Sequence, residues 1–207
     1  MQKICSPRST AKRTAVLDAA QACFLENGYA NTSMDMVAAR AGVSKATIYA
    51  HFENKDDLFG AIIRRRCDDH SDGLGAMSAS ETADARTVLT AMARHVTHML
   101  MMPEVMGIYR MVVSEAARHP DLAKVYYEAG PIRGKTILAE ILDSLVARGE
   151  LRPLNSWLAI DQFIGMLRAE CFHRALLGLP ADEIRAGLES TVEGAVEVMM
   201  RAYGAGK

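Results

Sequence analysis

Residues 32–52 read TSMDMVAARAGVSKATIYAHF, two short segments with an apolar pattern that meet at one glycine. Thr32 and Ser33 offer an N-cap to a helix over residues 34–41, and Ser44 offers one to a helix of about two turns. Gly42 lies where the chain needs a residue that tolerates a positive φ, so that the two helices can cross. The stretch therefore predicts a helix-turn-helix, which presents its second helix to the DNA major groove.

The second helix of this motif carries an outward face that a major groove can accept. Ser44, Lys45, Ala46 and Thr47 lie on it, and none of them is bulky or acidic. The flanks suit the DNA backbone, because hydroxyls and free N–H groups at a helix N-terminus bind anions. We expect phosphate contacts from Thr32, Ser33, Tyr49, His51 and Lys55, and contacts to phosphates or to a minor groove from Arg8, Lys12 and Arg13.

The order of these residues resembles the DNA-binding domain of the TetR family of transcriptional regulators. The resemblance is strong over about residues 10–60, although Ala46 stands where glycine is frequent and Met36 where an acidic residue is frequent. The matching runs are Thr32-Ser33, Val37-Ala38, Ala41-Gly42-Val43-Ser44, Ile48-Tyr49, His51-Phe52 and Lys55-Asp56-Asp57-Leu58.

This resemblance implies an all-α protein that binds a near-palindromic operator in double-stranded DNA as a homodimer. An N-terminal three-helix helix-turn-helix domain would precede a C-terminal helical ligand-binding and dimerisation domain. The run from Glu115 through Pro120-Asp121-Leu122 to Gly130 is similar to the C-terminal domain of AefR-like members. The resemblance assigns phosphate contacts to Thr32, Ser33, Ser44, Tyr49, His51 and Lys55, and base reading to Lys45, Ala46 and Thr47.

The rest of the chain also predicts helices, because strand-like alternation is absent and good helix formers dominate. We expect a fourth helix from residue 55 to about 69, followed by a loop or frayed helix end over 70–83. Gly130-Pro131 should kink or break a helix over 121–148. We divide the chain into a DNA-binding domain, 1–54, and an effector-binding and dimerisation domain, 55–207. The other helices are expected at 10–26, 84–102, 104–118, 156–177 and 181–203.

Charge is distributed unevenly along the 207 residues, although the net charge is only −1. Residues 1–66 hold ten Lys and Arg against six Asp and Glu, whereas the rest hold fourteen against nineteen. A basic N-terminal part fits a protein that meets phosphates there. No run of 18 apolar residues and no apolar signal core is present, so we expect a cytoplasmic protein outside the membrane. The four cysteines are scattered, so we expect free thiols and no metal or other cofactor.

The second domain is expected to bind a small, largely apolar effector that releases the dimer from its operator. Methionine is frequent over residues 92–111, and its flexible side chain suits an adaptable pocket as well as an ordinary core. His95 lies on the inward stripe of its helix and is the first candidate. The predicted pocket residues are His95, Met99, Met102, Tyr109, Tyr126, Phe163 and Glu170.

A dimer surface is expected on the last two helices, where apolar residues cover wide arcs that could also be simple core. On helix 181–203 this arc spans about half of the circumference. One part of it could meet the core and the remainder a partner. The predicted interface residues are Phe172, Leu188, Val192, Val196 and Met199.

Other functions remain open at this point. A metal-responsive regulator could use His95 and His98 or the run Cys67-Asp68-Asp69-His70, although no spacing matches a tetrahedral zinc site. A redox-responsive regulator could use Cys67 or Cys171, and the preceding Arg64, Arg65 and Arg66 can lower the pKa of the Cys67 thiol. A helical protein-binding adaptor would fit if the N-terminal part does not bind DNA. An enzyme is disfavoured, since no G-x-S-x-G, glycine-rich phosphate loop or HExxH motif occurs.

Overall fold

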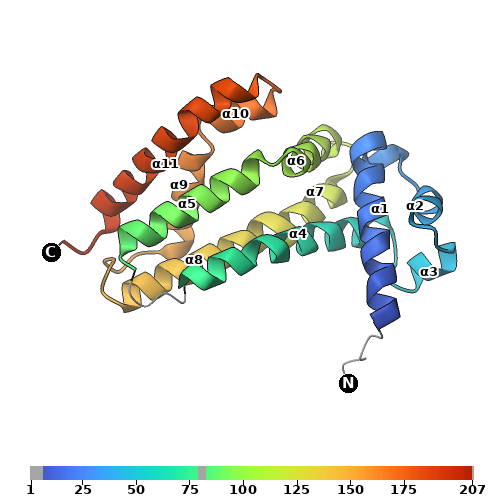
Figure 1. The fold of residues 1–207 in the computed structure, drawn as a ribbon, viewed down its shortest axis with the longest axis horizontal. Helices are drawn as coiled ribbons and strands as arrows, with labels where there is room; N and C mark the ends of the chain where they lie inside the picture. The colour runs from blue at the N-terminus through green and yellow to red at the C-terminus, as the bar shows by residue number, and fades with distance from the viewer. Residues whose placement is uncertain (1–6, 79–82, 207) are drawn as a thin grey trace. The chain divides into compact units, whose positions relative to one another are not determined.

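Helices make up most of the computed structural model, which describes residues 7–78 and 83–206 (Figure 1). The predicted all-α fold is confirmed, since the described residues contain one isolated β-bridge, Leu151 with Gly204, and no longer strand. None of the described helices combines the length and apolarity needed to cross a membrane. The helices are α1 (Pro7–Asn31), α2 (Met34–Ala41), α3 (Lys45–Tyr49), α4 (Lys55–Ser78), α5 (Ala85–Met101), α6 (Pro103–Glu115), α7 (Pro120–Tyr127), the π-helix η1 (Glu128–Ile132), α8 (Arg133–Ala147), α9 (Ser156–Leu167), α10 (Glu170–Leu176) and α11 (Ala181–Tyr203).

The chain folds into two compact units. The first unit comprises the described residues up to Arg66 together with Gly107–Pro131, and the second comprises Cys67–Met106 and Ile132 onward. The division into roles at residues 54 and 55 stays a prediction. The compact units differ from this division, because α6 from Gly107 onward and all of α7 pack with the N-terminal helices.

One apolar core holds the first unit together. The Phe24 ring of α1 stacks on the Tyr29 ring with 5.5 Å between their centres. It meets the Phe59 ring of α4 edge-on, with 5.6 Å between the centres. Ile48 of α3 is fully buried in the same core. The core also contains residues of α6 and α7, namely Ile108, Met111, Val112 and Leu122. The three N-terminal helices therefore bury their apolar faces partly against segments that come much later in the chain.

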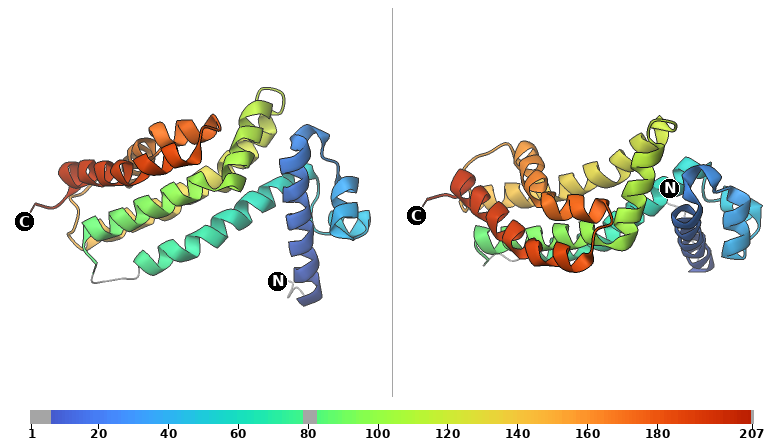
Figure 2. Two further views of the ribbon diagram at one scale, coloured as in Figure 1. Left: turned by 45° about the horizontal axis from the view of Figure 1, so that its top comes forward. Right: turned by 90° about the horizontal axis from the view of Figure 1, so that it is seen from above.

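The second unit is a helical layer arrangement in which α5 packs against α11 and α9, and α8 packs against α9 (Figure 2). Leu89 and Met92 of α5 and Phe163 of α9 are completely buried. Two ion pairs bridge α5 and α11 on the surface, Arg86 with Glu197 and Arg94 with Glu189.

Several helix boundaries differ from the sequence prediction. Helix α1 runs from Pro7 to Asn31, with a non-helical Gly28 inside it, where a helix over 10–26 was expected. Helix α4 continues to Ser78, so residues 70–78 are helical and not a loop, while 79–82 lie outside the described residues. Gly73 and Gly75 have low helix propensity, yet extending an existing helix adds one hydrogen bond per residue. The predicted helix 156–177 is divided at Arg168 and Ala169 into α9 and α10. The expected break at Gly130-Pro131 is a π-helix, consistent with a proline that has no N–H to donate.

Gly42 closes α2 as predicted, with φ 63° and ψ 32° in the left-handed region. Its N–H donates to the carbonyls of Ala38 and Ala39. A Cβ added there would meet nothing within 4 Å, so a substitution would strain the backbone without a clash.

Gly42→Ala is expected to lower the free energy of unfolding by about 1 kcal/mol, because an L-residue in the left-handed region is strained. Gly134→Ala is the matched control, since Gly134 lies inside α8 with equally open space around an added Cβ. That change should raise stability by roughly 0.5 kcal/mol, through lower chain entropy in the unfolded state. Urea unfolding followed by circular dichroism measures both, and shifts of the same sign would contradict the assignment.

Candidate functional site

Two serine caps and one glycine shape the helix-turn-helix. The Ser33 hydroxyl accepts a hydrogen bond from the Met36 N–H at 3.2 Å, and the Ser44 hydroxyl accepts one from the Thr47 N–H at 3.2 Å. Ile48 points into the core and fixes the orientation of α3. The opposite face of α3 is thereby turned outward, as a DNA-reading helix requires.

The predicted base-reading residues lie on this outward face. Lys45 and Ala46 are exposed, and the Thr47 hydroxyl lies 2.9 Å from that of Ser44. The Lys45 ammonium forms an exposed ion pair with Asp35 at 2.8 Å, and this hydrogen bond raises the pKa of Lys45. Exposed pairs contribute little to stability, so a DNA acceptor can replace Asp35. Tyr49 has 48% of its surface exposed.

Thr32, which was predicted to contact a phosphate, lies in the interior of the first unit. Its side chain is buried, with 2% exposed. The hydroxyl donates to the carbonyl oxygens of Gly28 at 2.8 Å and Cys23 at 3.1 Å. This hydroxyl therefore joins the start of α2 to the end of α1, and the structure does not support a phosphate contact by it.

Lys55 is also bound within the protein. Its Nζ donates to the carbonyl oxygens of Tyr29 at 2.8 Å and Thr32 at 3.1 Å, and lies 4.3 Å from the centre of the Tyr29 ring. Burial lowers the pKa of Lys55. The Tyr29 hydroxyl donates to the Asp56 carboxylate. The pKa of Tyr29 is raised, mainly by burial and also by the hydrogen bond and negative charge of Asp56. Lys55 thus satisfies carbonyls at the end of α1, where a cation is favourable, and is not free to meet a phosphate.

The other residues predicted to contact phosphates differ in how exposed they are. His51 is half-buried with its ring 6.3 Å from that of Phe52, and Lys12 is exposed. The Arg13 guanidinium lies 5.4 Å from the centre of the Phe52 ring. The side chain of Arg8 lies outside the part of the structure that is described.

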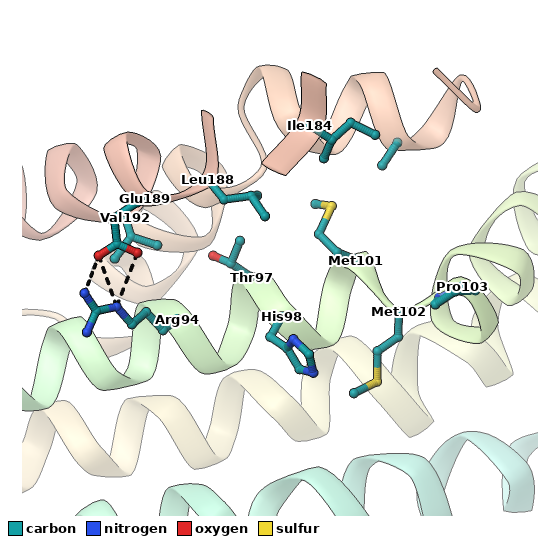
Figure 3. Close-up of a pocket in the computed structure, with 11 residues that line it drawn as sticks. Arg94, Thr97, His98, Met101, Met102, Pro103, Ile184, Leu188, Glu189 and Val192 are labelled. Atoms are coloured by element: carbon teal, nitrogen blue, oxygen red, sulfur yellow. Dashed lines mark hydrogen bonds and ion pairs between the residues drawn. The ribbon is translucent and has the colours of Figure 1, made fainter. Parts of the chain in front are cut away.

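In the second unit, a groove of about 540 Å³ opens between α5 and α11 (Figure 3). Of the predicted effector residues, Met102 alone lines it. Its lining residues are Arg94, Thr97, His98, Met101, Met102, Pro103, Ala175, Ile184, Leu188, Glu189 and Val192.

The structure does not bring the other predicted effector residues together. Phe163 is completely buried, and Glu170 is exposed and paired with Arg174 at 2.8 Å. Tyr109 and Tyr126 face each other at 6.2 Å in the first unit. His95 and Met99 are half-buried on α5 outside the groove lining. Helical periodicity identified an apolar stripe on α5, but it could not show which side of α5 borders a groove.

Comparison with known proteins agrees with this arrangement of a helix-turn-helix followed by a helical body. The profile of the tetR family of bacterial regulatory proteins matches residues 16–62, and that of the AefR-like transcriptional repressor C-terminal domain matches residues 87–205. The protein belongs to the TetR family of transcriptional regulators. It is accordingly a DNA-binding regulator of the repressor type and not an enzyme.

Similar TetR-family proteins include two solved structures. One, a TetR-family regulator from Mesorhizobium loti, is 30% identical with a TM-score of 0.82, and the match covers 96% of this chain and all of that one. The flavonoid-responsive regulator FrrA is 31% identical with a TM-score of 0.73, over 94% of this chain and 98% of that one.

Curated relatives match over different lengths. The regulator YvkB of Bacillus subtilis is 26% identical over 83% of this chain and 86% of its own. The transcriptional activator FasR of Mycolicibacterium smegmatis is 38% identical over 39% of this chain, and the match covers only 36% of FasR.

Most of the predicted dimer residues of this TetR-family protein lie inside the second unit. Phe172, Val192, Val196 and Met199 are buried within the chain itself, and Leu188 lines the groove. These side chains are therefore core or groove residues and are not available on the surface for a partner. The predicted interface residues lie on helices that contact α5 within the chain. An apolar arc has the same sequence pattern whether it covers a core or a partner, so the sequence could not distinguish the two.

Neither sensor alternative gains support from the side chains described. Among the residues that the structure describes, no three His, Cys, Asp or Glu side chains gather as metal ligands. Burial raises the pKa of the Cys67 thiol, against the lowering that a reactive thiolate needs. The three preceding arginines are engaged elsewhere, Arg64 with Asp57, Arg65 with Asp18 and Arg66 with Gln21.

Lys55→Met is expected to lower the free energy of unfolding by about 2 kcal/mol, because carbonyls at the end of α1 lose a charged donor. Lys45→Met is the matched control and should change the free energy of unfolding by less than about 0.5 kcal/mol, since the ion pair of Lys45 with Asp35 is exposed. Both are measured by urea unfolding. Equal destabilisation by the two changes would contradict the structural role of Lys55.

Proposed function

We propose that this protein is a ligand-responsive repressor, which binds a near-palindromic operator as a homodimer and leaves it when a small, largely apolar effector binds. The observation that carries the proposal is the orientation of α3. Buried Ile48 fixes the helix, while Lys45, Ala46 and Tyr49 are exposed and Thr47 is half-buried beside Ser44. A major-groove reader needs exposed polar and small side chains on a rigidly held helix.

Within this proposal, base and backbone contacts come from different residues. Lys45, Ala46 and Thr47 meet base edges, whereas Tyr49 and His51 donate to phosphate oxygens. Ser33 and Ser44 contribute the N-termini of α2 and α3, whose free N–H groups attract an anion. Thr32 and Lys55 act indirectly, by fixing the corner where α2 begins.

The homodimer is proposed to form through the surfaces of α9 and α11 that the chain leaves uncovered. Trp157 and Leu158 of α9 and Val198 of α11 are exposed apolar side chains. Gly165 and Gly194 have open space around an added Cβ, so another helix can approach closely there. Lys135 lies 4.2 Å from the centre of the Trp157 ring and forms an ion pair with Asp161, which holds this surface in place.

The effector is proposed to bind in the C-terminal region, 55–207, of a cytoplasmic regulator. FrrA, similar over almost the whole chain, is described as flavonoid-responsive, which supports a small and mostly apolar effector. Release requires the effector to bind the two arrangements of the dimer with different affinity. Helix α4 belongs to both compact units, and we propose that it transmits the change.

Selection of bound sequences from a random DNA pool tests the DNA-binding proposal. We expect a near-palindromic site. On this site, Lys45→Ala and Thr47→Ala should each weaken the free energy of DNA binding by about 1–3 kcal/mol. Each should also relax the base preference at one or two positions of each half-site. Tyr49→Phe should weaken binding to all sequences alike, because it removes a phosphate donor. Lys124→Ala, an exposed lysine on α7, is the control. Unchanged sequence preference in the Lys45 and Thr47 variants would refute these roles.

Val198→Asp should convert the dimer to a monomer in sedimentation equilibrium, because it puts a charge where an apolar surface is buried between partners. Val198 has 51% of its surface exposed, so the single chain should remain folded. Val113→Asp, at an equally exposed valine on α6, is the control and should leave the mass unchanged. A Val198→Asp dimer as stable as the wild type would place the interface elsewhere.

A further inference from the structure

The groove between α5 and α11 has the size of a small-molecule site, since such sites have volumes of about 300–1,000 Å³. Helices α5 and α11 are held together by Arg94 and Glu189 at one end of it. Beyond that ion pair, apolar side chains face each other across the groove. Figure 3 shows Met101 of α5 directed toward α11, with Ile184 and Leu188 on the other side.

Thr97 is the polar group that this apolar lining does not explain. The residue is 3% exposed, and its Oγ1 is buried without a hydrogen-bond partner. Figure 3 shows its side chain directed from α5 toward Leu188 and Val192 of α11. An unpaired buried hydroxyl is destabilising, and threonine in a helix has two favoured χ1 rotamers. Rotation about χ1 can therefore offer this hydroxyl to a ligand in the groove.

The charges at the groove favour an uncharged ligand. Its two ionised side chains, Arg94 and Glu189, already neutralise each other through several hydrogen bonds. An ionised head group placed among Met101, Leu188 and Val192 would lose water without a charged partner beside it. His98 also lines the groove, but its ring is directed away from α11 (Figure 3). A neutral hydroxyl would lose less and could pair with Thr97.

We propose that this groove binds an uncharged molecule made of an apolar body and one hydroxyl group, and that the hydroxyl hydrogen-bonds to Thr97. The role of this groove as the effector site rests on the proposed function. Binding itself can be measured without DNA, so a failure of the groove and a failure of DNA regulation are distinguishable. Flexible methionines at the groove accommodate apolar bodies of different shape.

Three probes that share one apolar body test the chemistry: 4-phenylphenol, biphenyl and biphenyl-4-carboxylate. Dissociation constants are measured on the full-length protein from the methyl resonances of Met101 and Met102, assigned with Met→Leu variants. One net hydrogen bond predicts that 4-phenylphenol binds about fivefold more tightly than biphenyl. The carboxylate should bind at least about tenfold more weakly than the phenol.

Two variants locate the site. Thr97→Val keeps the volume and removes an unpaired hydroxyl, so the fold should be retained. It should remove the preference for the phenol and leave biphenyl binding unchanged. Leu188→Trp should fill the groove and weaken both neutral probes more than about tenfold. Val113→Trp, on the exposed surface of α6, is the control for added bulk and should change neither affinity.

Several results would overturn the proposal. These are no shift of the Met101 and Met102 resonances with any probe, carboxylate binding as tight as phenol binding, or an undiminished phenol preference in Thr97→Val. Loss of the dimer in Leu188→Trp, measured by sedimentation equilibrium without a probe, would also overturn it, because a second copy of the chain would then occupy the groove. If Leu188→Trp fails to fold, the Thr97→Val comparison decides alone. Probe binding with the expected preferences but no effect on operator binding would retain the groove and reject its regulatory role.

Discussion

The arrangement of α2 and α3 depends on the hydrogen bonds that the Lys55 ammonium donates to backbone carbonyl oxygens. It donates to the carbonyl oxygens of Tyr29 and Thr32, and so fastens the start of α4 to the corner between α1 and α2. Thr32 completes that corner through its own hydroxyl, and Asp56 accepts from Tyr29. The bonds made by Lys55 and Asp56 have one charged partner in a half-buried place, where such bonds are stronger than surface ion pairs. The orientation of α2, and through Ile48 that of α3, follows from this corner.

A second constraint is that the helix-turn-helix does not have enough apolar surface to form a core alone. Small domains bury too little of their surface to be stable without additional segments. The structure meets this need with Ile108, Val112 and Leu122, which enter the same core from α6 and α7. Glu115 and His119 belong to these segments, and the His119 ring meets Tyr29 edge-on at 5.8 Å. Residues far along the chain are therefore part of the physical environment of the corner between α1 and α2.

In the second unit, α5 and α11 show how one contact between helices can change character along its length. At Leu89, Met92 and Val196 the side chains are buried in a closed core. Past the ion pair of Arg94 with Glu189, a groove opens beside Thr97. Buried polar groups are normally paired, so the unpaired Thr97 hydroxyl distinguishes the groove from ordinary core.

The sequence by itself determined the all-α class, the family, the caps of α2 and α3, and the left-handed glycine between them. Caps and turns are local chemistry, since Ser33, Gly42 and Ser44 interact with residues only three or four positions away. Tertiary structure alone decided that Thr32 and Lys55 bind carbonyls, that Phe172 and Val196 are core, and that Thr97 borders a groove. Each of these depends on partners remote in the chain or on neighbouring helices, and helical periodicity shows only that a residue shares a face with others. An apolar or basic side chain has the same pattern in a sequence whether it faces a core, a partner or DNA.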